Sequence, residues 1–126
     1  MRKRKAGRSV ASLAEAQLVQ FLVFDLKPEV TAEEREELLK ATRALEQIPG
    51  VISVRLGTTL ANPPTRRYQL GCIIYYADIK AREGFLPHPI HRDFAEKYLR
   101  MTNREDRLNS IVDLRPSSES LPYKER

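Results

Sequence analysis

The sequence predicts an α+β fold in which helices cover one face of an antiparallel sheet. Two observations carry this prediction: apolar runs typical of strands alternate with segments of helical periodicity in the order β-α-β-β-α-β, and proline or glycine stands at most of the boundaries. The length of 126 residues suits one domain and is too short for two. This element order is that of a ferredoxin-like unit, a four-stranded sheet with both helical segments on one face.

The first strand is predicted at residues 17–27, which are almost continuously apolar. Side chains alternate along a strand, so Phe24 and the residues at even spacing from it share one face, which Gln20 interrupts, while Phe21 lies on the other face. Asp25 stands near the end of this run, and we expect it at a solvated loop edge.

The first helix is predicted from Thr31 to about Gln47. Thr31 and Glu34 have the spacing of a capping box, in which each side chain accepts a hydrogen bond from the backbone amide of the other residue. Apolar residues then recur at helical spacing on one side, and charged residues occupy the other. Pro49 and Gly50 end the helix, since neither residue favours its continuation.

The rest of the chain divides at its turn residues. We expect a second strand at 51–56, a polar loop at 57–67, a third strand at 68–76, a short helix at 78–86, a longer helix at 89–101 and a final strand at 110–114. Asp78 is expected to cap the short helix, and Pro89 to open the longer one.

The first and third strands carry apolar residues on both faces. With helices on one side only, the other side of the sheet would expose an apolar patch to water, which soluble monomers rarely do. We therefore predict that a second copy packs sheet against sheet, which gives a two-fold homodimer whose eight strands form a dimeric α+β barrel.

The charge of the chain is concentrated at its N-terminus. The formal charge of +5 corresponds to five basic residues: Arg2, Lys3, Arg4, Lys5 and Arg8. The other residues carry 17 basic and 17 acidic side chains, so the domain lacks the basic surface of a nucleic-acid module. We interpret residues 1–16 as a basic disordered tail, 17–114 as the folded domain and 115–126 as a flexible C-terminal tail. Binding of the basic tail to nucleic acid or an anionic surface is the weaker alternative.

The composition also indicates in which cellular compartment the protein is expected. No apolar run approaches the roughly 18 residues of a membrane span, and no signal-peptide core follows the basic start. Cys72 is the only cysteine of the chain, so it cannot form an internal disulfide. A soluble, cytoplasmic protein without a membrane partner is the expectation.

The two histidines, His88 and His91, stand three residues apart where the last helix begins. A metal site would need further ligands, and the spacing of Cys72 and Asp93 gives no support for one, so we predict neither a metal nor a cofactor. A histidine near its ordinary pKa suits proton transfer at neutral pH. The third interpretation is structural, in which each imidazole bonds backbone groups near the helix break.

Other familiar catalytic patterns are missing from the sequence. There is no glycine-rich phosphate loop and no serine in a nucleophile-elbow context. Tyr68, Tyr75 and Tyr76 of the third strand are expected to pack their rings in the core or the dimer interface, with the hydroxyls at the rim.

Two motifs about forty residues apart connect the chain to a family. Gln47-Ile-Pro-Gly-Val-Ile-Ser-Val and His88-Pro-Ile-His-Arg-Asp-Phe, in this element order, resemble the stress-responsive A/B barrel (Dabb) family. The resemblance runs from about Leu18 to Leu114 and implies a dimeric α+β barrel. In the olivetolic acid cyclase type of this family, the second histidine of the motif is catalytic, and it corresponds to His91.

The same resemblance argues against that cyclase reaction. The partner tyrosine of the cyclase type corresponds to Phe85 here, two further pocket histidines correspond to Gln20 and Leu70, and a helix tyrosine corresponds to Thr42. The histidine that acts as the base in the cyclase type is therefore present here as His91, but its tyrosine partner and the other polar residues of that pocket are replaced.

The sequence thus predicts a homodimeric stress-responsive A/B barrel protein that binds a small apolar or aromatic molecule between sheet and helices. The candidate pocket residues are Gln20, Phe24, Leu70, Phe85 and His88, with His91 as the candidate catalytic residue. The alternative is a cofactor-free cyclase or isomerase of polyketide or aromatic metabolism that uses His91 as general base. The sequence leaves open whether the protein is an enzyme.

Overall fold

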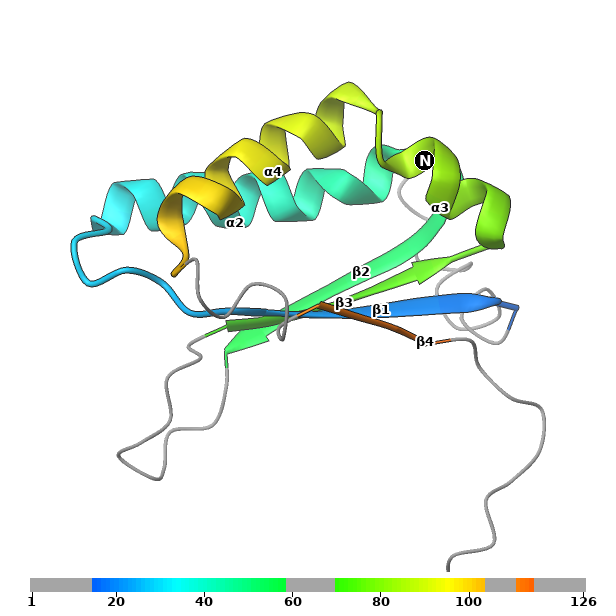
Figure 1. Ribbon diagram of the computed structural model, residues 1–126, viewed down its shortest axis with the longest axis horizontal. Coiled ribbons are helices and arrows are strands. Elements are labelled where there is room, and N and C mark those ends of the chain that lie inside the picture. Colours follow the sequence, from blue (N-terminus) through cyan, green and yellow to red (C-terminus); the bar gives the residue numbers. More distant parts are fainter. Residues whose placement is uncertain (1–14, 59–69, 104–110, 115–126) are drawn as a thin grey trace, which may run out of the picture.

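The computed structural model describes residues 15–58, 70–103 and 111–114 and has the predicted order of elements. These elements are β1 (Leu18–Phe24), α2 (Ala32–Ala44), the 3-10 turn η1 (Leu45–Gln47), β2 (Val51–Thr58), β3 (Leu70–Tyr76), α3 (Ile79–Phe85), α4 (Pro89–Met101) and β4 (Ile111–Leu114). They form two layers, with the helices on one side of the sheet (Figure 1). None of the helices in the described ranges is long and apolar enough to cross a membrane.

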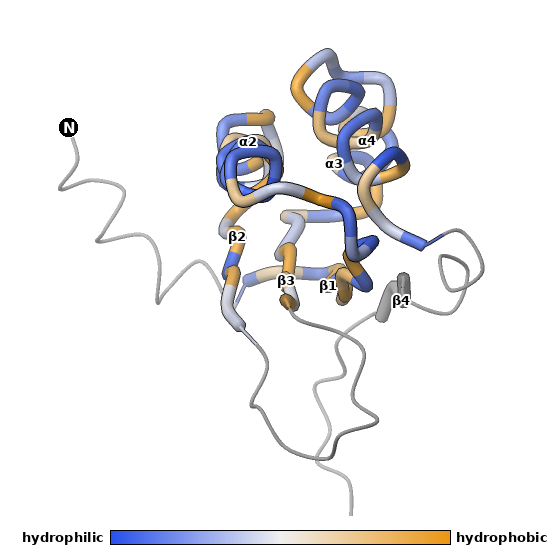
Figure 2. The backbone as a smooth tube through the Cα atoms, turned by 90° about the vertical axis from the view of Figure 1, so that its left-hand side faces the viewer, coloured by the Kyte–Doolittle hydropathy of each residue, from blue (hydrophilic) through white to orange (hydrophobic). Residues whose placement is uncertain are grey.

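The sheet has the strand order β2-β3-β1-β4, and every neighbouring pair is antiparallel. Strands β3 and β1 therefore lie at the centre. Viewed along the strands, α2 lies over the β2 side of the sheet, and α3 and α4 lie over the β1 side (Figure 2). This arrangement confirms the ferredoxin-like α+β fold predicted from the element order.

The core lies between the sheet and the helices. On β3 every second side chain is buried, as period-two alternation predicts: Leu70, Cys72, Ile74 and Tyr76. The helices contribute further buried apolar residues: Leu38, Ala41, Phe85, Phe94, Tyr98 and Met101. The Phe24 ring of β1 packs edge-on against Tyr98, with ring centroids 5.3 Å apart. Leu22 and Phe24 of β1 face this core, which confirms the predicted inner face of the first strand.

Local signals set the helix ends. The Glu34 amide donates to Thr31 Oγ1 at 3.1 Å, and the Thr31 amide donates to Glu34 Oε1 at 3.0 Å, so the predicted capping box is present. Gly50 has φ +92°, and a Cβ atom there would collide with Ala81. Only glycine meets both conditions, which explains the sharp turn into β2. Asp78 Oδ1 accepts from the Ala81 amide at 2.8 Å and caps α3 as predicted.

The prediction for Asp25 was wrong. Its residue is only 7% exposed, and its backbone carbonyl accepts a hydrogen bond from the Asn103 amide at 3.0 Å. The segment after α4 packs alongside the end of β1 here, where Leu26 forms an isolated antiparallel bridge with Thr102. This long-range pairing covers a position that the local sequence, a charged stretch before Pro28, marks as a loop edge.

Strand β2 is longer than predicted. Gly57 and Thr58, expected in a polar loop, pair with Gly71 and Leu70 of β3. Backbone pairing with a central strand extends the element beyond the point where its apolar pattern stops. A register shift between Val51 and Ser53 also interrupts the alternation at the start of β2.

Several predictions fall outside the described residues. These are most of the basic tail, the greater part of the 57–67 loop, Tyr68 and the C-terminal tail. The proposed boundaries of the folded domain therefore stay predictions.

Candidate functional site

A pocket of about 240 Å³ lies between the sheet and the helices. Its lining comes from β1, β3, α3, α4 and the turn between the two helices: Gln20, Leu22, Ile74, Arg82, Phe85, Leu86, His91, Phe94, Ala95, Tyr98 and Leu99. Most of these side chains are apolar or aromatic, with a few polar groups among them. This composition is typical of small-molecule sites, in which an apolar wall surrounds a few polar points.

His91 stands in the first turn of α4 and is half-buried. Its Nδ1 lies 2.9 Å from the backbone carbonyl oxygen of Leu86. A carbonyl oxygen only accepts hydrogen bonds, so Nδ1 carries the proton. In the neutral ring, Nε2 is then the nitrogen with the lone pair, and it is the atom that could act as a base.

Burial lowers the pKa of His91 below its ordinary value of 6.5. The hydrogen bond to Leu86 opposes this shift, and the positive charge of Arg82 adds to the lowering. His91 is therefore neutral at pH 7, which is the protonation state that a general base requires.

Phe85, which corresponds to the partner tyrosine of the cyclase type, packs as an apolar ring beside His91. The two ring centroids are 4.6 Å apart, and Phe85 is only 1% exposed. The Phe85 ring also packs edge-on against Tyr76, with ring centroids 5.1 Å apart. Phe85 therefore gives His91 an aromatic neighbour but no hydroxyl partner.

Gln20 is buried and takes part in a hydrogen bond between neighbouring strands of the sheet. Its Oε1 accepts from the Tyr76 hydroxyl at 2.6 Å, and both residues are buried. Because β1 and β3 pair Gln20 with Ile74 and Leu18 with Tyr76, the two bonded side chains are diagonal neighbours on one face. Gln20 is also one of the polar residues that line the pocket.

His88 has a different place from His91. It is the N-cap of α4, and its Nδ1 accepts from the Ile90 amide at 3.1 Å. It does not belong to the lining of the His91 pocket but borders a separate depression next to Gly50 and Asp78. The geometry fits the structural interpretation of His88, since its ring satisfies a backbone amide at the helix start.

The remaining predicted pocket residues lie deeper. Phe24 and Leu70 are in the fully packed core and are not part of the pocket lining. Thr42 donates its hydroxyl to the Leu38 carbonyl within α2 at 2.7 Å. Whether any of these residues takes part in binding stays a prediction.

The structure gives no support for a metal centre in the residues that it describes. No group of three or more histidine, cysteine or acidic side chains in these ranges could hold an ion. Burial raises the pKa of the Cys72 thiol to about 12, so this thiol is protonated at neutral pH. Asp93 forms an ion pair with Lys97 at 2.8 Å on the outer face of α4.

Sequence reasoning missed Arg82, an arginine among the described residues that line the pocket. Its guanidinium carbon lies 5.6 Å from the centroid of the Tyr76 ring and 5.8 Å from that of Phe85. A usable signal was present: residues three apart on a helix share a face, so Arg82 lies on the same side of α3 as Phe85.

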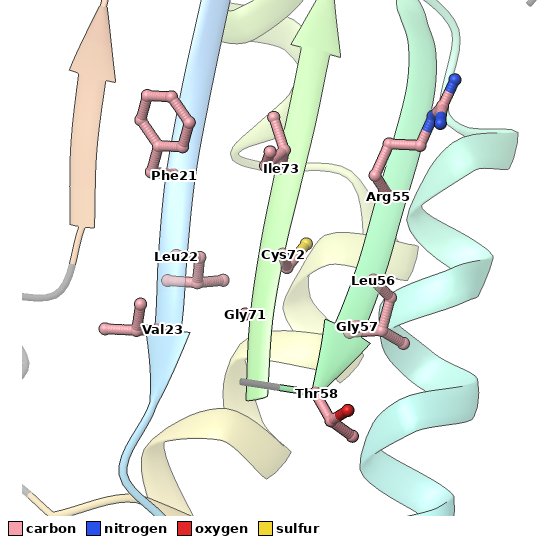
Figure 3. Close-up of a pocket in the computed structure, with 10 residues that line it drawn as sticks. All are labelled: Phe21, Leu22, Val23, Arg55, Leu56, Gly57, Thr58, Gly71, Cys72 and Ile73. Carbon is pink, nitrogen blue, oxygen red and sulfur yellow. The ribbon is translucent and has the colours of Figure 1, made fainter. Parts of the chain in front are cut away.

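A second, larger depression of about 400 Å³ lies on the sheet face opposite the helices. Figure 3 shows its floor where Gly57 and Gly71, which pair across β2 and β3, carry no side chains. Phe21 and Ile73 stand at its border, and Phe21 is 37% exposed. None of the described residues that line this hollow is a histidine or a carboxylate, so we regard the His91 pocket as the candidate site.

The family model of the stress responsive A/B barrel domain matches residues 18–109. A crystallised protein of Arabidopsis thaliana is 22% identical, with 82% of this chain and 99% of that one covered and a TM-score of 0.67. The hydroxynitrile lyase of Passiflora edulis is 17% identical over 85% and 99% of the two chains, with a TM-score of 0.66. A dimeric ferredoxin-like protein of unknown function from Thermobifida fusca is 16% identical over 81% and 91%, with a TM-score of 0.64. No curated protein matches the sequence.

Proposed function

We propose a function from the premise that this chain belongs to the stress-responsive A/B barrel domain family: it binds a small apolar or aromatic molecule in the pocket beside His91. The observation that supports this most directly is the pocket itself, an apolar hollow of about 240 Å³ into which Gln20, Arg82 and His91 bring polar groups. A role in a stress response and a cytoplasmic location stay predictions.

The size of the pocket limits the ligand. An apolar cavity of about 150 Å³ in another protein holds benzene, so 240 Å³ has room for one ring with small substituents or for a short chain. Aromatic side chains supply much of the wall: Phe85, Phe94 and Tyr98. Such a wall favours a flat, apolar ligand body.

Binding can be tested with a library of single-ring fragments screened by ligand-observed NMR. The chain contains no tryptophan, so Leu99→Trp at the mouth of the pocket introduces a single fluorescent reporter. The matched control is Glu96→Trp, on the exposed side of the same helix. We expect bound fragments to change the fluorescence of the Leu99→Trp variant and to leave the Glu96→Trp variant unchanged. If no fragment binds with a Kd below about 10 mM, the proposal is wrong.

We further propose that the protein is a homodimer through the open sheet face. Apolar side chains are present on this face: Val19, Phe21, Val23 and Ile73. A neighbour with the same fold is described as dimeric, which supports the proposal. Covering the partly exposed Phe21 ring by a second copy would remove the largest exposed apolar side chain on β1 from water.

Sedimentation measures this assembly directly. Phe21→Asp puts a charge in the centre of the proposed interface and is expected to give a monomer. The control is Ile79→Asp, which changes an exposed apolar residue of α3 on the helix side. A wild-type protein that sediments as a monomer, or a Phe21→Asp variant that stays dimeric, would contradict the proposed interface.

A second candidate function is catalytic, with His91 as the general base of a cofactor-free cyclase or isomerase. The specific observation in its favour is the hydrogen bond from Nδ1 to the Leu86 carbonyl, which leaves the Nε2 lone pair as the basic site of a neutral ring. The hydroxynitrile lyase among the structural neighbours is an enzyme with this fold. A positioned general base typically accelerates proton transfer by about 10²- to 10⁴-fold.

The proton-transfer step can be measured before a substrate is known. Fragments that bind and carry a C–H next to a carbonyl are incubated in D2O, and loss of that proton signal gives the exchange rate. His91→Asn keeps an N–H where Nδ1 donates to Leu86 but removes the base, so exchange should fall by about 10²- to 10⁴-fold. Equal exchange rates in the wild type and in the His91→Asn variant would exclude His91 as the base and leave the binding function intact.

A further inference from the structure

The hollow on the open sheet face lies where one cross-strand row lacks side chains, and we call it the glycine hollow. Gly57 of β2 pairs with Gly71 of β3, and Gly71 pairs with Val23 of β1, so only Val23 contributes a side chain to this row (Figure 3). A Cβ atom added to either glycine would have no atom of the described residues within 4 Å. The packing of the described chain therefore does not require glycine at either position.

The backbone geometry does not require these two glycines either. Neither of them has a positive φ, in contrast to Gly50, and the register between β2 and β3 is regular at Gly57 and Gly71. A glycine inside a strand weakens the strand, and where it makes no bulge or bend it often marks a place that another molecule approaches closely. The glycine pair thus points to a partner outside this chain.

The next row of the same sheet face is bulky. Phe21 pairs with Ile73, and Ile73 pairs with Arg55, so these three residues form a row beside the glycine row. Among the large apolar side chains that are exposed in the described ranges, Phe21 is the one that belongs to a strand. The Arg55 guanidinium is directed away from the two glycines (Figure 3). The face therefore has a partly exposed aromatic ring next to a hollow of about 400 Å³.

From these two rows we infer that Phe21 of a second copy fills the glycine hollow, and that Phe21 of this copy fills the same hollow of its partner. The inference rests on the proposed homodimer and names the contact that fits its two faces together. In a two-fold dimer every contact between two different residues occurs twice, once in each direction. A face that carries both a projecting ring and a hollow can therefore be complementary to itself.

The size of the hollow and the way in which sheets pack support this occupant. An apolar cavity of about 150 Å³ in another protein holds benzene, so the glycine hollow has room for a phenyl ring. Side chains of two sheets that pack face to face interdigitate. Without a side chain from the partner, the glycine row would leave a void in an interface whose core is normally packed as densely as a protein interior. A neighbour with this fold is dimeric, which supports a second copy as the partner.

The test exchanges the ring and the hollow between two chains and measures dimer affinity by sedimentation velocity. Gly71→Leu fills the hollow, and Phe21→Ala removes the ring. Each variant alone should dimerise at least about tenfold more weakly than the wild type, because the first homodimer has two clashes and the second has two voids.

A mixture of the two variants gives the decisive comparison. In the mixed dimer the filled hollow faces the shortened side chain, and the intact hollow receives the intact ring, so both defects are relieved. We expect the mixed dimer to be about tenfold or more tighter than either variant homodimer, because the two changes are coupled only if position 21 meets position 71 across the interface. The matched control is Gly84→Leu on α3, on the helix side, where an added Cβ also has no described atom within 4 Å. This control should leave the dimer affinity unchanged.

A measurement on the wild-type chain covers the case in which Gly71→Leu fails to fold. Isotope-labelled and unlabelled copies are mixed, and filtered NMR spectra then report only contacts between the two copies. We expect nuclear Overhauser effects between the Phe21 ring protons of one copy and the Gly71 Hα protons of the other.

The outcomes separate this inference from the homodimer on which it rests. If the wild type is monomeric, the proposed homodimer fails and the inference fails with it. If the wild type is dimeric but the mixed dimer is no tighter than the variant homodimers, the homodimer stands and the inference about Phe21 is wrong. Filtered NMR contacts that place a different side chain of the partner at Gly71 would overturn the inference in the same way.

Discussion

The buried hydrogen bond between Tyr76 and Gln20 gives a sharp test of how this sheet accommodates polar side chains. Tyr76→Phe removes the hydroxyl and keeps the ring, so the packing against Phe85 is retained. The Gln20 oxygen then loses its donor in a site where its residue is only 6% exposed. Leaving a buried acceptor unsatisfied costs about 1–3 kcal/mol, so we expect the free energy of unfolding to fall by about this amount.

A double-mutant cycle isolates the pair. Gln20→Met removes the acceptor with little change in length, and by itself it should also destabilise, because the Tyr76 hydroxyl loses this partner. Replacing both partners by apolar groups of similar shape can be nearly neutral, so the double variant should lose much less than the sum of the single losses. The expected coupling is of order 1–2 kcal/mol.

Urea unfolding followed by far-ultraviolet circular dichroism measures these differences. All variants are compared at one protein concentration, since dimerisation would make the stability concentration-dependent. Tyr75→Phe, the adjacent tyrosine on the open face of β3, is the matched control and should change stability by less than about 0.5 kcal/mol. If Tyr76→Phe is as stable as wild type, or if the cycle is additive, the hydrogen bond does not stabilise the sheet and the reasoning fails.

Three further predictions concern a helix cap, a turn and a titration. Thr31→Ala breaks the capping box of α2 and should lower the free energy of unfolding by about 1 kcal/mol, measured by urea titration. Gly50→Ala should destabilise by more than about 1 kcal/mol in the same assay, because its φ of +92° is strained for alanine and the added Cβ meets Ala81. The pKa of His91 is lower in the folded than in the unfolded state, so the unfolded chain binds more protons in acid. The wild type therefore loses free energy of unfolding as the pH falls from above 6.5 through the pKa of the folded state. Between pH 7.5 and 5, the wild type should lose more of this free energy than the His91→Asn variant.

Each of these predictions has its own control. For the turn, Gly84→Ala in the exposed part of α3 has no neighbour within 4 Å of the new Cβ and should stabilise by up to about 1 kcal/mol. For the cap, Thr58→Ala at the exposed end of β2 should have a smaller effect than Thr31→Ala. For the titration, the carboxylates are common to both proteins and cancel in the difference, so parallel pH profiles would contradict the lowered pKa of His91.

The helix ends were predictable because their determinants are local. The longer helix was predicted at 89–101 and is found at Pro89–Met101, since a proline at the first position and helical periodicity act within the segment itself. The predicted capping box is likewise confirmed, and its two residues, Thr31 and Glu34, are only three positions apart. The antiparallel sheet with its helices on one face was predicted from the order of the elements, because few topologies connect these elements without crossing.

The errors arose where distant segments meet. Asp25 is buried because Asn103, 78 positions along the chain, packs against it. Strand β2 continues to Thr58 because β3 pairs with it there. Neither contact has a signal in the residues around the position that it changes.

The features of the candidate site likewise fall into those set by local sequence and those set by contacts between distant segments. The sequence by itself determined that His91 opens a helix, that an apolar wall surrounds it and that Gln20 interrupts an apolar strand face, because motif, periodicity and composition are properties of short segments. Only the tertiary structure decided that Nδ1 bonds Leu86, that Gln20 bonds Tyr76 56 residues away, and that Arg82 lines the same pocket. Those facts depend on the distances between β1, β3, α3 and α4, and such distances are fixed only when the helices pack on the sheet and water is excluded between them.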